Sequence, residues 1–112
     1  MHVLGKCYRY GQGLRKSPEK GFALELKAAR KGIVEAQFSA GVCLSRGEGV
    51  RLNPEQAFKW YLKAAKKGHD DAAYTLGYFY DTGRGVRKNS RKAQYWYARA
   101  EVLRKKRAGV AP

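Results

Sequence analysis

Apolar residues in the middle of the chain recur three and four positions apart, which places them on one face of an α-helix. One such stretch runs from Val34 to Ser45. A second stretch begins at Pro54 and ends before Gly68. The pattern therefore predicts two amphipathic helices joined by a short loop that contains two glycines.

The same arrangement recurs with a period of 36 residues, nearly three times along the chain. A fixed period of this length is typical of a solenoid, in which stacked helical units bury one continuous core. The sequence thus predicts an all-α fold, an alpha-alpha solenoid of about three 36-residue helix-turn-helix repeats. Matching small residues occupy these sets of positions: Gly5, Gly41 and Gly77; Gly11, Gly47 and Gly83; Gly13, Gly49 and Gly85; Ala28, Ala64 and Ala100.

A single domain of 112 residues is predicted. Met1 aligns with Gln37, inside a predicted helix, so the first repeat is expected to be truncated at its N-terminus. The last helix has no glycine stop and is expected to cap the array, ending near Lys106 or Arg107. The predicted boundaries are 1–32, 33–68 and 69–112 for the three repeats within the domain 1–112.

Local signals mark the helix ends. Asn53 is a predicted N-cap, Pro54 suits the first helical position, and Gly47 is a predicted C-terminal stop. Asp70 is predicted to cap the next helix, with His69 in a surface turn before it. The positions equivalent to Asn53 are Ser17 and Asn89. Large rings are expected to fill the space between layers, namely Phe38, Phe58, Trp60, Tyr74 and Trp96.

Several of these residues carry a family resemblance. Leu76-Gly77, Tyr80 and Gly83-Arg84-Gly85-Val86 are followed by Lys92-Ala93 and Trp96-Tyr97, and Lys59 to Gly68 repeats the second half of this pattern. The chain resembles the Sel-one-like repeat (SLR) family, which is related to the tetratricopeptide repeats. The resemblance covers nearly the whole chain and implies a role in protein–protein interaction, as an adaptor, scaffold or regulatory partner.

The charge balance changes the picture of possible partners. The chain has 24 Lys and Arg against 9 Asp and Glu, a formal net charge of +15. Such a field attracts an acidic protein, nucleic acid or anionic lipid. The alternative interpretation is a merely soluble basic surface.

Cysteines and the N-terminus bear on location and metal chemistry. Cys7 and Cys43 occupy the same site in successive repeats, too far apart for a disulfide if the helices pack normally. This fits a reducing compartment. No leader sequence is visible, so the cytoplasm is favoured, while a periplasmic or secreted location stays open if a leader was removed. Two cysteines and two histidines suggest no metal site.

Catalytic and cofactor motifs are missing from the sequence. The paired-glycine loops, such as Gly47-Glu48-Gly49, follow no predicted strand and lack the third glycine of a dinucleotide site. Neither cysteine has a histidine at a suggestive spacing. The chain is therefore predicted to be no enzyme and to bind no cofactor.

Two groups of residues remain as candidate binding sites. The first is a ladder along one edge, formed just after each glycine loop by Arg15, Lys16, Arg51, Arg87 and Lys88. The second lies on the first helix of each repeat, which typically lines the concave face of a solenoid. Its candidate residues are Lys6, Arg9, Gln37, Ser39, Val42, Arg46, Tyr74, Tyr78 and Asp81. For each of them an ordinary solvated surface is the alternative.

These observations predict a non-catalytic module that binds a protein partner, acidic in character, through a basic edge and the groove of the solenoid. The alternative is a helical-repeat protein that binds nucleic acid, with tyrosines stacked on bases. The repeat argues against this alternative, because most tyrosines fall on positions that the core needs.

Overall fold

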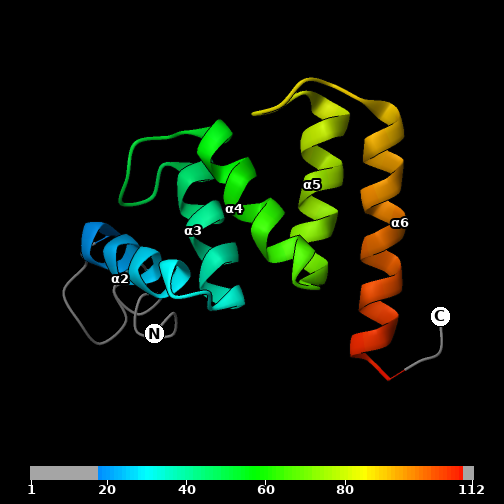
Figure 1. Ribbon diagram of the computed structural model, residues 1–112. Helices are drawn as coiled ribbons and strands as arrows, with labels where there is room; N and C mark the ends of the chain where they lie inside the picture. The colour runs from blue at the N-terminus through cyan, green and yellow to red at the C-terminus, as the bar shows by residue number, and fades with distance from the viewer. Residues whose placement is uncertain (1–17, 110–112) are drawn as a thin grey trace.

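The computed structural model describes residues 18–109 and consists there of five α-helices in a curved row (Figure 1). Within this range no residue is in a β-strand. Each helix packs against its neighbours in sequence, as expected of a solenoid. The predicted all-α solenoid is confirmed. The helices are α2 (Pro18–Arg30), α3 (Val34–Arg46), α4 (Pro54–Lys66), α5 (Asp70–Thr82) and α6 (Ser90–Arg107).

The helix ends follow the local signals closely. The Asn53 side chain accepts a hydrogen bond from the Gln56 amide at 3.1 Å, and Asn89 caps α6 in the same way. Gly47 ends α3 in the left-handed conformation, with φ of 72°. The last helix ends at Arg107, as predicted. Ser17 lies outside the described residues.

The start of α5 differs from the prediction. His69, rather than Asp70, is the N-cap, and its Nδ1 accepts a hydrogen bond from the Ala72 amide at 3.1 Å. His69 is also buried, at 8% exposed, with its ring stacked 4.6 Å from that of Phe38. Since Nδ1 accepts, the proton of the neutral ring lies on Nε2, which is 3.3 Å from Glu35 Oε2. The surface turn predicted for His69 is therefore wrong, because the preceding repeat covers the ring.

Replacing His69 with alanine is expected to lower the free energy of unfolding by about 1–2 kcal/mol, since a cap and a buried ring contact are both lost. Urea denaturation followed by circular dichroism measures this change. His69→Asn keeps a capping side chain and is expected to recover part of the loss. An unchanged stability for His69→Ala would contradict the role assigned to this residue.

Small residues let the helices of a pair approach closely. A Cβ added to Gly77 would lie 2.7 Å from the Tyr97 ring, and one added to Gly41 would lie 2.8 Å from the Tyr61 ring. Alanines fill most of the remaining core. The rings of Phe38, Phe58, Trp60 and Trp96 are only partly buried against it. Tyr74 is 54% exposed, so its predicted place between layers is wrong; no helix of the described residues lies over it.

Each described paired-glycine loop connects the two helices of one repeat and packs against the preceding repeat. A Cβ on Gly49 would overlap the carbonyl oxygen of Pro18, and one on Gly85 would overlap that of Pro54. Each loop therefore presses on the start of the second helix of the preceding repeat. This contact, which needs glycine, places the two loops at corresponding points of the array.

Within the described residues, no helix is long and apolar enough to cross a membrane.

Candidate binding surfaces

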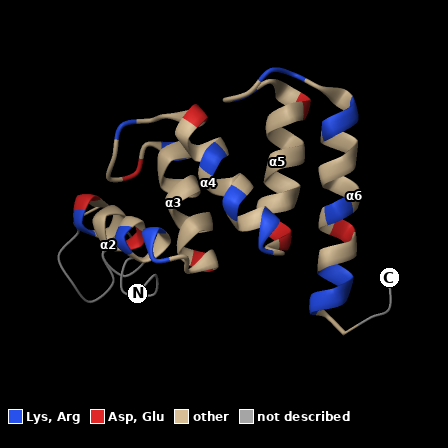
Figure 2. Cartoon of the chain, viewed as in Figure 1, with Lys and Arg blue, Asp and Glu red and all other residues tan. Residues whose placement is uncertain are grey.

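Basic residues are exposed in the loops that follow α3 and α5, the first helices of the second and third repeats. Arg51 lies between α3 and α4, and Arg87 and Lys88 lie between α5 and α6. Figure 2 shows the basic parts of both loops on the same side of the array, at the top in this view. We call Arg51, Arg87 and Lys88, with Arg15 and Lys16 at the equivalent positions of the first repeat, the basic loop edge. Arg15 and Lys16 lie outside the described residues.

The loops hold these basic residues at fixed points of the backbone. The Asn53 amide donates to the Leu44 carbonyl at 2.9 Å, and the Asn89 amide donates to Tyr80 in the same way. Within residues 18–109, none of the three basic side chains forms an ion pair. They are therefore available to an anionic partner.

Arg84, in the loop after α5, has a structural role instead. Its guanidinium donates to the Ser45 carbonyl at the end of α3, and it lies 5.9 Å from the centre of the Phe79 ring. It therefore ties the third repeat to the second. No sequence pattern pointed to a structural role for Arg84, although it is the one basic residue between the paired glycines.

The predicted groove residues divide into exposed and buried ones. Tyr74, Tyr78 and Asp81 are exposed along α5, and Arg46 is exposed at the end of α3, 4.0 Å from Glu48. Val42 is half-buried against the core. Lys6 and Arg9 lie outside the described residues.

The prediction that Gln37 and Ser39 line an open groove is wrong, because both side chains are buried. Gln37 is 4% exposed, and its Nε2 donates to the Ala29 carbonyl at 3.3 Å, across the boundary with α2. Ser39 is also buried. The Gln37 side chain therefore belongs to the packing between α2 and α3 rather than to an open groove.

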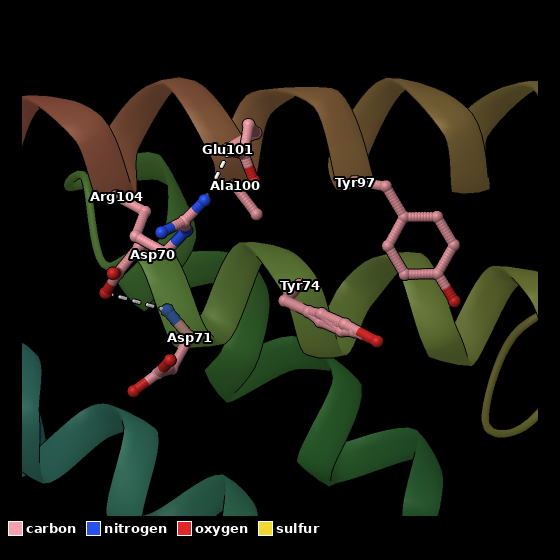
Figure 3. Close-up of a pocket in the computed structure, with 7 residues that line it drawn as sticks. All are labelled: Asp70, Asp71, Tyr74, Tyr97, Ala100, Glu101 and Arg104. Carbon is pink, nitrogen blue, oxygen red and sulfur yellow. Dashed lines mark hydrogen bonds and ion pairs between the residues drawn. The ribbon is translucent and has the colours of Figure 1, made fainter.

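A cavity of about 500 Å³ lies between α5 and α6 (Figure 3). The rings of Tyr74 and Tyr97 stand side by side in it, with centres 5.1 Å apart. Burial raises the pKa of the Tyr97 phenol, and the nearby charge of Asp81 adds to the rise. The lining consists of Asp70, Asp71, Tyr74, Tyr97, Ala100, Glu101 and Arg104.

A second cavity, of about 480 Å³, lies between α2 and α4 and was missed by the sequence analysis. It contains Lys63, whose Nζ is 4.6 Å from the centre of the Trp60 ring, and Lys67, which donates to the Gly32 carbonyl at 3.2 Å. One sequence signal pointed to this surface: Lys63 shares its repeat position with two other basic residues, Lys27 and Arg99.

In the part of the chain that the structure describes, no group of side chains could hold a metal ion.

Comparison with known proteins supports the repeat assignment. A family model described as Sel1 repeat matches residues 1–33, 34–69 and 70–101. No curated protein matches the chain.

Solved structures give the same picture. A Sel1 repeat protein from Oxalobacter formigenes matches with a TM-score of 0.88 and 37% identity. The alignment covers 96% of this chain and 44% of the Oxalobacter protein. A protective antigen of uropathogenic Escherichia coli strains, which displays an SLR fold, matches with a TM-score of 0.87 and 33% identity. The alignment covers 89% of this chain and 21% of the antigen. Cysteine rich protein B of Helicobacter pylori matches with a TM-score of 0.73 and 27% identity. The alignment covers 80% of this chain and 68% of the Helicobacter protein.

The chain thus spans less than half the length of the first two of these relatives. The helices, the repeat period and the relatives all agree. The chain belongs to the Sel1 repeat family, whose members are generally non-catalytic scaffolds for protein interaction.

Proposed function

We propose that this chain is a non-catalytic binding module for an acidic protein partner, which it contacts through the basic loop edge. The observation that carries the proposal is the repetition of Arg51 and Arg87 at equivalent positions in matching loops, exposed and free of ion pairs in the described residues. Arginine binds carboxylates through two parallel hydrogen bonds, so a row of them suits an acidic surface.

The mechanism has an electrostatic step and a packing step. The net charge of +15 steers an acidic partner toward the array, and the basic loop edge orients it. Exposed rings on α5 then anchor the contact, since Tyr74 and Tyr78 are of the residue type that most often dominates binding energy. Asp81, on the same helix, restricts which part of the partner can lie over α5.

The experiment compares two variants with the same net charge. The edge variant combines Arg15→Glu, Arg51→Glu and Arg87→Glu; the helix variant combines Lys27→Glu, Lys63→Glu and Arg99→Glu. Both sets have the 36-residue period, and the described members of both are exposed. Affinity capture from native lysate, quantified by mass spectrometry, is expected to lose the acidic partner roughly tenfold with the edge variant only.

Recovery of the same partners by the edge variant would refute the proposed role of the loops. Nucleic acid is tested in parallel by titrating mixed-sequence DNA and RNA at increasing salt. The proposal predicts no binding at physiological salt, whereas tight binding that falls steeply with salt would favour the nucleic-acid alternative.

A further inference from the structure

The cavity between α5 and α6 has a covered counterpart within the same chain. Tyr74, Tyr97 and Ala100 lie 36 residues after Phe38, Tyr61 and Ala64. In the second repeat, α5 covers that surface: His69 stacks on Phe38, and Phe79 packs edge-on against Tyr61 at 5.3 Å. In the third repeat, no helix of the described residues covers the equivalent rings, and the cavity remains open.

The way α5 is held shows what such a surface accepts. His69, at the start of the segment, contacts Phe38 and Glu35. Leu76 and Phe79 bury their side chains in the middle. Arg84, fifteen residues after His69, donates to the carbonyl of Ser45 at the far end. The covering segment thus combines an apolar face with a basic or protonatable side chain at each end.

The third repeat carries carboxylates at the two points that these end residues would reach. Asp71 is equivalent to Glu35, and Asp81 is equivalent to Ser45. Both are exposed, and neither forms an ion pair with any described residue. The surface is therefore acidic at both ends and aromatic between them, although the chain as a whole is strongly basic.

The other charged groups beside the cavity are already paired. Arg104 binds Glu101 on α6, and Arg107 lies 2.8 Å from Asp70. The two pairs offset the charges of Asp70 and Glu101, and the Arg107–Asp70 pair holds the end of α6 against the start of α5. Asp71 and Asp81 are left as the unneutralised charges of the α5 rim.

We propose that this end surface, defined by Asp71, Tyr74, Asp81, Tyr97 and Ala100, docks an amphipathic helix of a partner protein with the pattern of His69 to Arg84. The helix would carry a basic or histidine side chain at its start, Leu and Phe seven and ten residues later, and arginine fifteen residues later. This inference rests on the proposed function only in treating the chain as an interaction module.

A second copy of the chain is a poor occupant. The face of α5 that carries the pattern is buried in its own chain, since Leu76 and Phe79 pack against the second repeat. A partner helix does not meet this obstacle.

The probe is a synthetic peptide of residues His69 to Arg84, held helical by a staple that joins positions 71 and 75 on its solvent side. Binding to the full chain is followed by fluorescence anisotropy and by amide chemical shifts. The control peptide carries His69→Glu and Arg84→Glu. The proposal predicts saturable binding with shifts centred on α5 and α6, and roughly tenfold weaker binding of the control.

Protein variants locate the contact. Asp71→Lys combined with Asp81→Lys changes exposed side chains only and is expected to weaken binding roughly tenfold. The edge variant is expected to bind the peptide as the unaltered chain does, which separates failure here from failure of the proposed function. The inference is overturned if both peptides bind alike, if the aspartate changes have no effect, or if the shifts fall on the loops. Self-association abolished by the aspartate changes would also overturn it, in favour of a second copy.

Discussion

Replacing Phe79 with alanine is expected to lower the free energy of unfolding by about 3–5 kcal/mol. Phe79 is 2% exposed and is the largest of the fully buried side chains among residues 18–109. Its ring packs against Tyr61 of α4 and beneath Arg84, so it joins the second repeat to the third. In a solenoid each repeat is stabilised only by its neighbours, and a cavity at this junction therefore weakens the whole array.

Urea denaturation followed by circular dichroism measures the loss. The matched control is Tyr95→Ala, which removes a ring that is 59% exposed and is expected to change stability by less than about 0.5 kcal/mol. If Phe79→Ala and Tyr95→Ala had similar effects, the junction between α4 and α5 would not hold the repeats together as described.

The second large effect is expected from Gly85→Ala, at about 2–4 kcal/mol. Gly85 has φ of 68°, where an L-residue is strained, and a methyl group there would overlap the Pro54 carbonyl. The backbone at the start of α4 is fixed by the Asn53 cap and cannot move away without losing it. The loop after α5 would then separate from the second repeat.

Gly83→Ala provides the control for this change. Gly83 has a similar φ of 74°, but its nearest neighbour outside the adjoining residues is the Lys88 Cβ at 3.3 Å, which is a side-chain atom. The difference in melting temperature between the two variants therefore measures the backbone overlap alone. Equal melting temperatures would show that the glycine loop does not press on α4.

Much of the fold could be predicted because its signals are local. Asn53 and Pro54 start a helix by satisfying or lacking backbone donors within one turn, and Gly47 ends one by its own conformation. The period then extended these assignments along the chain. His69 was misjudged because its partner Phe38 lies in another repeat, and nothing in the neighbouring sequence indicates the contact.

The binding surfaces were predicted less completely, for a related reason. Exposure of Arg51 and Arg87 follows from their place after a glycine loop. The burial of Gln37 depends on the carbonyl of Ala29 in the preceding helix. The open surface at Tyr74 depends on what covers each repeat, which requires comparing the repeats in three dimensions rather than aligning them.

We propose that the basic loop edge, rather than net charge, selects the partner. The most direct test measures association rates of the captured partner with the unaltered chain, the edge variant and the helix variant over a range of salt concentrations. Association is expected to be roughly tenfold slower for the edge variant than for the helix variant at low salt, with the difference shrinking as salt rises. Equal slowing of both variants would show instead that binding follows total charge alone.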